Sequence, residues 1–306
     1  MEVYLAKTQG FCAGVTYAIA IVESTLQRYG APLYVYHEIV HNTRVVGEFR
    51  KRGVIFVEDV DTVPLGARLI FSAHGVSPVE IIRAEKRQLH IFDATCPLVA
   101  KVHEEAVRFS QQGCEVILIG HKGHQEIIGT SGYIDPRHLH IIENEDDLEL
   151  LTIERNAKVA YLTQTTLAVD ETKKIVDRLK QKFPNCLPRP LSDLCYATQN
   201  RQDAVKELAT SCDIIIICGS ANSSNSNRLR ETGAKTGVES YIIDNAQELD
   251  LTLLKHKRAI GISSGASVPR DIVDEVVQKI KILFPAAQIY TFPDPEKNIV
   301  FKLPEI

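Results

Sequence analysis

The sequence of 306 residues predicts an α/β protein made of three units with mainly parallel sheets, related by a pseudo-threefold repeat. Three observations support this fold class. Short apolar strands alternate with amphipathic helices along the chain, which is typical of parallel sheets. A cysteine stands at the start of a helix once in each third, at Cys12, Cys96 and Cys195. Polar motifs follow the strands at similar distances after each of these cysteines.

The first third alternates between strands and helices. A strand is expected at 3–7, and the helix after Cys12 should end near Tyr29, because Gly30 and Pro32 follow. Further segments follow the same plan, with strands at 33–37, 54–58, 68–73 and 90–94 and helices at 46–53 and 78–88.

The strand at 90–94 runs into Thr95, Cys96 and Pro97. Proline is tolerated in the first turn of a helix, since its missing N–H would be unpaired there. Cys96 is therefore expected at a helix N-terminus, where free N–H groups and the helix dipole stabilise a thiolate.

The other two thirds repeat this plan. In the second we expect strands at 115–120, 139–144 and 158–163 and helices at 97–113, 145–151 and 168–184. In the third we expect strands at 213–219, 241–244 and 259–263 and helices at 199–211, 227–237 and 271–284. The tail carries three prolines after residue 290 and is expected to wrap over the surface.

These patterns place the three units at 13–96, 97–194 and 195–306. We expect residues 1–12 to complete the last unit, with the strand at 3–7 joining its sheet. A tail strand near 288–292 competes for the same place.

The spacing of polar residues supports the repeat. Polar residues follow the three cysteines after 29, 28 and 29 positions, and again after 62, 69 and 72 positions. The first set is His41, His124 and Ser224, and the second is His74, Thr165 and Ser267. Ligands of open α/β sheets bind at the carboxyl ends of the strands. We therefore expect three cysteines and six polar loops around one cavity.

Three converging thiolates suit an iron–sulfur cluster better than structural zinc. Zinc sites usually have four ligands, often with close C-x-x-C pairs, and the sequence has no such pair. Three cysteines suit a cubane cluster that leaves one iron open to act as a Lewis acid. The remaining cysteines are interpreted as small buried hydrophobes, at positions 114, 186, 212 and 218.

The polar loops indicate an anion site. The runs 223–227 and 264–267 combine hydroxyl, amide and glycine groups that can cradle phosphate. Histidines at 41, 74 and 124 add donors whose charge can switch. Glu126, close to His124, is the natural proton donor. The competing interpretations are ordinary turns and a solvated loop carboxylate.

Composition excludes other classes of function. A net charge of −4 with both signs mixed argues against binding to nucleic acid or to an anionic membrane surface. The N-terminus has no apolar signal segment, and the apolar run at 214–218 is too short to span a bilayer. We expect a cytoplasmic protein with reduced cysteines, since seven is an odd number without a secretory signal.

The motifs closely resemble those of the 4-hydroxy-3-methylbut-2-enyl diphosphate reductase family, which catalyses the last step of the non-mevalonate isoprenoid route. The resemblance runs from residue 9 to about 270 through GFCAGV, HEIVHN, FSAHGV, FDATCPLV, GHKGHQE, TQTT, CYATQNRQ, SSNSNRL and SGAS. It implies three lobes around a central [4Fe-4S] cluster. It also implies reductive removal of an allylic hydroxyl with two electrons and two protons, giving isopentenyl and dimethylallyl diphosphate.

The resemblance also implies residue roles. Cys12, Cys96 and Cys195 match the cluster ligands, which leaves one open iron, and Glu126 matches the proton donor. Thr165 matches a threonine near the substrate hydroxyl. The diphosphate-binding positions match His41, His74, His124, Ser223, Ser224, Asn225 and Ser267. One departure is Gln125, where proline is expected in many members.

The sequence has no flavin or nicotinamide signature, so an external one-electron donor of the ferredoxin or flavodoxin type is implied. Two alternatives remain. One is a dehydratase that uses the cluster as a Lewis acid without net reduction. The other is a non-catalytic anion-binding protein with a structural cluster.

Overall fold

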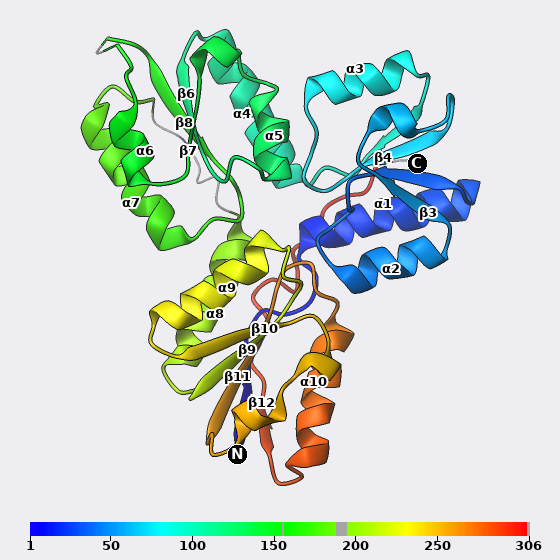
Figure 1. Ribbon diagram of the computed structural model, residues 1–306, viewed down its shortest axis with the longest axis vertical. Coiled ribbons are helices and arrows are strands. Elements are labelled where there is room, and N and C mark those ends of the chain that lie inside the picture. Colours follow the sequence, from blue (N-terminus) through cyan, green and yellow to red (C-terminus); the bar gives the residue numbers. More distant parts are fainter. Residues whose placement is uncertain (155, 188–194, 305–306) are drawn as a thin grey trace. The chain divides into compact units, whose positions relative to one another are not determined.

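The computed structural model describes residues 1–154, 156–187 and 195–304. These form an α/β fold with three parallel sheets (Figure 1). The chain divides into two compact units. Unit 1 contains residues 1–16, 41–47 and 196–300, and unit 2 contains 17–40, 48–195 and 301–306.

The division at 13–96, 97–194 and 195–306 stays a prediction. Its boundary at 194 lies outside the described residues, as does most of the segment expected to lead into Cys195.

Unit 1 contains a parallel sheet in the order β10-β9-β11-β1-β12. Its strands are β1 (Glu2–Leu5), β9 (Ile214–Cys218), β10 (Glu239–Ile243), β11 (Ala259–Ser264) and β12 (Gln288–Tyr290). Val3 of β1 is in register with Ile260 on one side and with Ile289 on the other. The N-terminal strand and the tail strand therefore occupy neighbouring places, and the expectation that they compete was wrong.

Helices cover both faces of this sheet (Figure 1). Ile215 and Ile217 pack with α8 (Tyr196–Ala209) and α9 (Ser224–Lys235). Ile214 and Ile216 pack with α10 (Arg270–Leu283) and with the 3₁₀ turns η3 (Ala246–Glu248) and η4 (Leu251–Leu254). Successive side chains of a strand point to opposite faces, so a strand buried on both sides reads as one continuous apolar run.

Unit 2 contains two sheets. The first has the order β3-β2-β4-β5 and consists of β2 (Leu33–Tyr36), β3 (Val54–Val57), β4 (Arg68–Phe71) and β5 (His90–Asp93). The neighbouring helices are α1 (Ala13–Tyr29), α2 (Thr43–Lys51), α3 (Pro78–Lys86) and the 3₁₀ turn η1 (Val60–Thr62). The first turns of α1 and α2 belong to unit 1.

The second sheet of unit 2 has the order β7-β6-β8, with β6 (Glu115–Ile119), β7 (Leu139–Ile142) and β8 (Val159–Thr163). One face packs against α4 (Pro97–Gln111) and α5 (Gln125–Ser131), and the 3₁₀ turn η2 (Pro136–His138) precedes β7. The other face packs against α6 (Glu145–Leu150) and α7 (Val169–Lys182). Helix α5 was not predicted, because its seven residues are too few for a periodic pattern.

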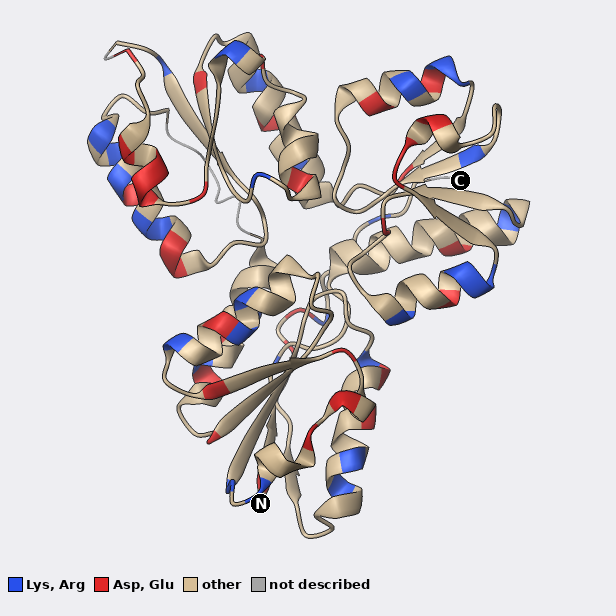
Figure 2. Ribbon diagram, viewed as in Figure 1, with Lys and Arg blue, Asp and Glu red and all other residues tan. Residues whose placement is uncertain are grey.

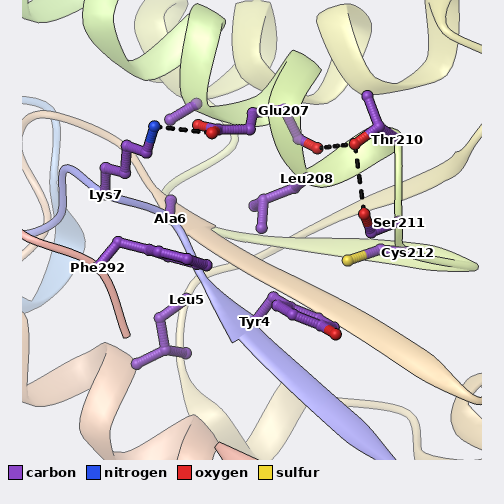
Figure 3. A pocket seen from close by; sticks show the side chains of 11 residues that line it. Tyr4, Leu5, Ala6, Lys7, Glu207, Leu208, Thr210, Ser211, Cys212 and Phe292 are labelled. Atoms are coloured by element: carbon purple, nitrogen blue, oxygen red, sulfur yellow. Dashed lines mark hydrogen bonds and ion pairs between the residues drawn. The ribbon is translucent and has the colours of Figure 1, made fainter. Parts of the chain in front are cut away.

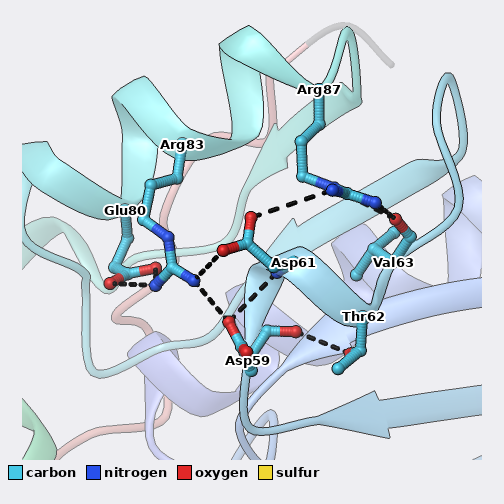
Figure 4. A network of polar contacts seen from close by, with 7 residues as sticks. All are labelled: Asp59, Asp61, Thr62, Val63, Glu80, Arg83 and Arg87. Carbon is cyan, nitrogen blue, oxygen red and sulfur yellow. Dashed lines mark hydrogen bonds and ion pairs between the residues drawn. The ribbon is translucent and has the colours of Figure 1, made fainter.

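Charged residues of both signs occur along α3 and α7 (Figure 2). One cluster ties α3 to η1, where Arg83 contacts Asp59, Asp61 and Glu80 (Figure 4). Exposed pairs of this kind contribute little each, roughly 0–1 kcal/mol. Among the described helices, none has the length and apolar content needed to cross a membrane.

Candidate functional site

Each of the three predicted cluster cysteines directly precedes a helix. Cys12 comes before α1, Cys96 is the N-cap of α4, and Cys195 comes before α8. All three are half-buried. The Cys12 Sγ accepts a hydrogen bond from the Val15 N–H at 3.5 Å, which is the contact that stabilises a thiolate at a helix N-terminus.

Each of the three cysteines makes the same kind of backbone contact, in which its N–H donates to a carbonyl of another loop. The Cys12 N–H donates to the Ala266 carbonyl at 3.0 Å, the Cys96 N–H to the Ala73 carbonyl at 3.0 Å, and the Cys195 N–H to the Thr165 carbonyl at 3.2 Å. Ala266 and Ala73 come just before Ser267 and His74. Each cysteine is thus tied to the second polar motif of the repeat before it, with Cys12 bonded beside the motif that follows Cys195. The same contact recurs at all three cysteines, which supports the repeat.

The other four cysteines are poor candidates for metal ligands. Burial raises the pKa of the Cys114 thiol, raises that of Cys186 to about 11, and raises those of Cys212 and Cys218 to about 12. A thiol with a raised pKa resists forming the thiolate that binds metal. In the part of the chain that the structure describes, no group of three His, Cys, Asp or Glu side chains could hold a single metal ion.

Glu126 lies in the first turn of α5, not in a loop, and it is 2 % exposed. Its Oε1 accepts a hydrogen bond from the Thr165 N–H at 2.6 Å, and its Oε2 lies 3.0 Å from the Thr165 hydroxyl oxygen. Burial raises the pKa of the Glu126 carboxyl from 4.5 to about 7, against the lowering effect of these two hydrogen bonds. A carboxyl group with such a pKa holds a proton near neutral pH and can deliver it.

His124 begins the same helix. Its Nδ1 accepts a hydrogen bond from the Glu126 N–H at 3.2 Å, so His124 is the N-cap of α5. The ring of His74 stands at 86° to that of His124, with 6.0 Å between the ring centroids. The Ser72 hydroxyl lies 3.4 Å from the His74 Nδ1. Unit 2 therefore gathers two of the predicted diphosphate-binding histidines beside the predicted proton donor.

His103 on α4 was not singled out from the sequence. It is 7 % exposed, its ring stacks on Tyr133 at 4.5 Å, and burial lowers its pKa to about 4. It packs under the loop that carries His74, since a Cβ atom at Gly75 would lie 2.4 Å from the His103 ring. Gly75 also has a φ of +74°, which disfavours other residues. No sequence signal indicated that His103 supports the His74 loop, because a lone histidine within a helix belongs to no recognisable pattern.

Unit 1 gathers the hydroxyl and amide loops. Ser223 is the N-cap of α9, where its hydroxyl accepts a hydrogen bond from the Ser226 N–H at 3.3 Å. The helix therefore begins at Ser224, three residues earlier than predicted. Asn225 is 7 % exposed, and neither polar atom of its side chain has a hydrogen-bond partner among the described residues. Its Nδ2 would lie 3.5 Å from a Cβ at Gly265, which places the amide against the loop of Ser267.

The loop of His41 is anchored within unit 1. The Ser267 hydroxyl donates to the His41 carbonyl at 2.9 Å. The hydroxyls of Thr43 and Ser220 both donate to the carboxylate of Asp244. Asp244 therefore joins the His41 loop to the turn after β9. Asp244 was not singled out from the sequence, although it stands at the end of a predicted strand.

The predicted site residues divide between the two units. Those in unit 1 are Cys12, His41, Ser223, Ser224, Asn225 and Ser267, and those in unit 2 are His74, Cys96, His124, Glu126, Thr165 and Cys195. None of them lines the cavity of about 230 Å³ that lies between β1, α8 and Phe292 (Figure 3). That cavity is bordered by Tyr4, Leu208 and Cys212, with the Lys7–Glu207 ion pair at one end.

The family model described as "LytB protein" matches residues 3–281 of this chain. The chain belongs to the LytB protein family. Members of this family are iron–sulfur enzymes.

A relative in Psychrobacter arcticus, named 4-hydroxy-3-methylbut-2-enyl diphosphate reductase, is 46 % identical over 308 residues, which cover 100 % of this chain and 96 % of the relative. The solved structure of the E-1-hydroxy-2-methyl-but-2-enyl-4-diphosphate reductase from Plasmodium falciparum is similar with a TM-score of 0.96 and 39 % identity. The match covers 99 % of this chain and 95 % of that one.

A second solved structure, described as (E)-4-hydroxy-3-methyl-but-2-enyl diphosphate reductase, the terminal enzyme of the non-mevalonate pathway, has a TM-score of 0.65 and 32 % identity. The match covers 92 % of this chain and 100 % of that one. The two solved structures share the α/β fold described above, over 99 % and 92 % of this chain.

Proposed function

We propose that this chain reductively dehydroxylates (E)-4-hydroxy-3-methylbut-2-enyl diphosphate to isopentenyl and dimethylallyl diphosphate. The allylic hydroxyl leaves as water, and the reaction consumes two electrons and two protons. The observation that carries the proposal is the similarity to reductases of this name along the whole chain. The buried Glu126–Thr165 pair supports it, because the reaction needs a protonated acid near neutral pH.

In this proposal Cys12, Cys96 and Cys195 hold one [4Fe-4S] cluster, which leaves one iron without a protein ligand. The chain offers a suitable donor set, since these three half-buried thiols stand at helix starts, while burial raises the pKa values of the other four. When bound, such a cluster would supply a Lewis-acidic iron and a path for electrons.

The loops of unit 1 are proposed to bind the diphosphate. Asn225 presents a buried amide with no partner among the described residues, and Ser223 and Ser224 stand at the start of α9, where free N–H groups attract anions. His41 and Ser267 are joined by a hydrogen bond, so they can act as one group. His74 and His124 are proposed to add donors from unit 2.

Glu126 and Thr165 are proposed to deliver one proton to the leaving hydroxyl, which departs as water, while the second proton consumed is added to carbon. The Glu126 carboxyl contacts both the N–H and the hydroxyl of Thr165. When Glu126 is protonated, the Thr165 hydroxyl can accept its proton and donate its own to the substrate oxygen. The N–H of Thr165 holds the carboxyl in place throughout, because it bonds the other oxygen.

The electrons are proposed to come from an external one-electron donor of the ferredoxin or flavodoxin type. An external donor is needed because the reaction consumes two electrons and the sequence has no flavin or nicotinamide motif that could supply them.

The test is anaerobic turnover of the iron-loaded protein with the allylic diphosphate and a reduced viologen dye. We expect both products and two electrons consumed per product. Cys12→Ser, Cys96→Ser and Cys195→Ser should each abolish turnover and lose the visible spectrum of the cluster, while the control Cys186→Ser should keep both. Loss of water without electron consumption, giving a product other than these two, would instead indicate a dehydratase, and binding without turnover would indicate a non-catalytic protein.

A further inference from the structure

Arg201 is the largest fully buried side chain among the described residues, and it lies outside the predicted site. It belongs to α8, and its side chain has an exposed fraction of 0 %. A buried charge is costly unless a partner and hydrogen bonds compensate it. The contacts of Arg201 therefore indicate which parts of the fold this buried charge holds together.

The guanidinium makes three kinds of contact. Its Nη1 donates to the Glu296 carboxylate, at 3.1 Å to Oε1 and 2.9 Å to Oε2, and to the Ala197 carbonyl at 3.2 Å. Its Nη2 donates to the Gly10 carbonyl at 2.9 Å. The Asn200 side chain also donates to Glu296, at 3.1 Å. One planar group thus connects α8, the C-terminal tail and the turn just before Cys12.

The turn of residues 10–12 is held from its other side by the loop after β11. The Gly10 N–H donates to the Ser264 hydroxyl at 3.2 Å, and the Cys12 N–H donates to the Ala266 carbonyl at 3.0 Å. Arg201 supplies the contact on the opposite side, through the Gly10 carbonyl. Both the Arg201 bond and the Ser264 bond involve Gly10, so loss of either frees the same peptide segment.

We infer that Arg201 and Glu296 form a positioning pair that fixes the turn carrying Cys12. Glu296 neutralises and orients the guanidinium, and the guanidinium holds the Gly10 carbonyl. The tail is therefore part of the support of a predicted cluster ligand, in addition to the surface that it covers. The consequence for the cluster rests on the proposed function, whereas the consequence for the turn does not.

The test compares Glu296→Gln and Arg201→Lys in the full-length protein. Glu296→Gln keeps the shape of the side chain but leaves the guanidinium charge unpaired. Arg201→Lys keeps the charge but loses the planar fork, so one ammonium group cannot reproduce both sets of contacts. The control is Lys7→Met, which removes an exposed ion pair of 2.7 Å between Lys7 and Glu207. Glu207 belongs to α8, the helix that carries Arg201.

The first readout is amide hydrogen exchange in the metal-free protein. In both variants we expect the amides of Gly10 and Cys12 to exchange about tenfold faster or more, because a local opening becomes easier. The amides of Ile216 in β9 and Ala100 in α4 should change much less, and Lys7→Met should leave all four unchanged. The second readout is iron release to a chelator from the loaded protein, which should be several-fold faster in both variants.

Unchanged exchange at Gly10 and Cys12 in the folded variants would overturn the inference, as would an equal acceleration at all four amides, which indicates a general loss of stability. If Arg201→Lys does not fold, the milder Glu296→Gln decides between these outcomes. Faster exchange at the turn with unchanged iron release would support the positioning pair and would count against Cys12 as a cluster ligand.

Discussion

The N-terminal turns of α5 and α9 are built alike, but they differ in whether a buried polar side chain has a hydrogen-bond partner. Each helix follows a buried strand and a short polar turn, and each begins at an N-cap from the predicted site, His124 in one and Ser223 in the other. The second helical residue is Glu126 in α5 and Asn225 in α9. Both side chains are buried, but Glu126 is bonded to Thr165, whereas Asn225 has no partner among the described residues.

The difference shows how two similar helix starts can be prepared for different tasks. A buried amide without partners lowers stability until a ligand supplies the missing hydrogen bonds. A buried carboxyl that the fold itself holds needs no ligand, and the cost of its burial appears as a raised pKa. We therefore expect variants at the two positions to fail in different ways.

The largest effect is expected for Glu126→Gln. Glutamine keeps the size and can still accept a hydrogen bond from Thr165, but it cannot supply a proton. Loss of a positioned general acid costs a factor of about 10²–10⁴ in rate. Turnover should fall by that factor while substrate affinity and the cluster spectrum change little.

The measurement is anaerobic steady-state turnover together with calorimetric substrate binding. The matched control is Glu145→Gln, an exposed acidic residue in the first turn of α6. Turnover of Glu126→Gln at the parent rate would remove this residue from the mechanism.

Asn225→Ala should show the opposite pattern. A hydrogen bond to a charged group is worth about 1.5–3 kcal/mol, so substrate should bind roughly ten- to a hundredfold more weakly. The ligand-free protein should be as stable as the parent or more stable, because a buried amide without partners among the described residues has been removed.

Calorimetry and thermal unfolding of the same samples check both expectations for Asn225→Ala. Asn227→Ala provides the contrast, since the Asn227 amide bonds the Ala221 and Ser223 carbonyls, and its loss should lower stability. A clear loss of stability in ligand-free Asn225→Ala would show that the amide already has a partner.

Variants of His124 test two functions of one residue, because His124 is expected both to bind the diphosphate and to cap α5. His124→Ala should lose affinity and also about 1 kcal/mol of stability, as an N-cap replaced by alanine does. His124→Asn should lose affinity but keep the stability, since asparagine is a favourable N-cap. Urea unfolding of the two variants measures the difference, and equal stabilities would show that the cap contributes nothing.

Sequence alone predicted the strands and the long helices, because their periodic patterns extend over many residues. It placed α9 three residues too late, because Ser224–Ser226 look like a loop although Ser223 caps the helix. It did not predict α5, whose N-cap is a histidine and therefore an unusual start signal.

The predicted site residues carry recognisable motifs, but their environments depend on contacts far apart in sequence. The Glu126 carboxyl is held by Thr165, which is 39 positions away. The contact between Arg201 and Glu296 spans 95 positions and involves a tail expected to lie on the surface. Pairings of this kind leave no local pattern, so sequence periodicity cannot reveal them.

In the parent protein the smallest effect is expected in the pH dependence of stability, because Glu126 and His103 titrate with opposite consequences. Burial raises the pKa of Glu126 from 4.5 to about 7, so the folded protein binds more protons than the unfolded chain between these values. Its contribution to the free energy of unfolding therefore falls as the pH rises from 4.5 to about 7. Burial lowers the pKa of His103 from 6.5 to about 4, with Asp93 opposing, so its contribution rises from pH 4 to 6.5.

Each shift corresponds to about 3 kcal/mol, at about 1.4 kcal/mol for one pKa unit, so the two contributions nearly cancel in the parent protein.

Single variants should separate the contributions of Glu126 and His103. Relative to the parent, Glu126→Gln should gain stability as the pH rises from 4.5 to about 7, because the falling contribution is gone. His103→Phe, which keeps a ring against Tyr133, should lose stability relative to the parent as the pH rises from about 4 to 6.5. Urea unfolding of the metal-free proteins across this range gives both difference curves, and other titrating groups cancel in the differences. Two flat curves would show that neither group changes its pKa on folding, and Glu126 would then lack the property that suits it to donate a proton at neutral pH.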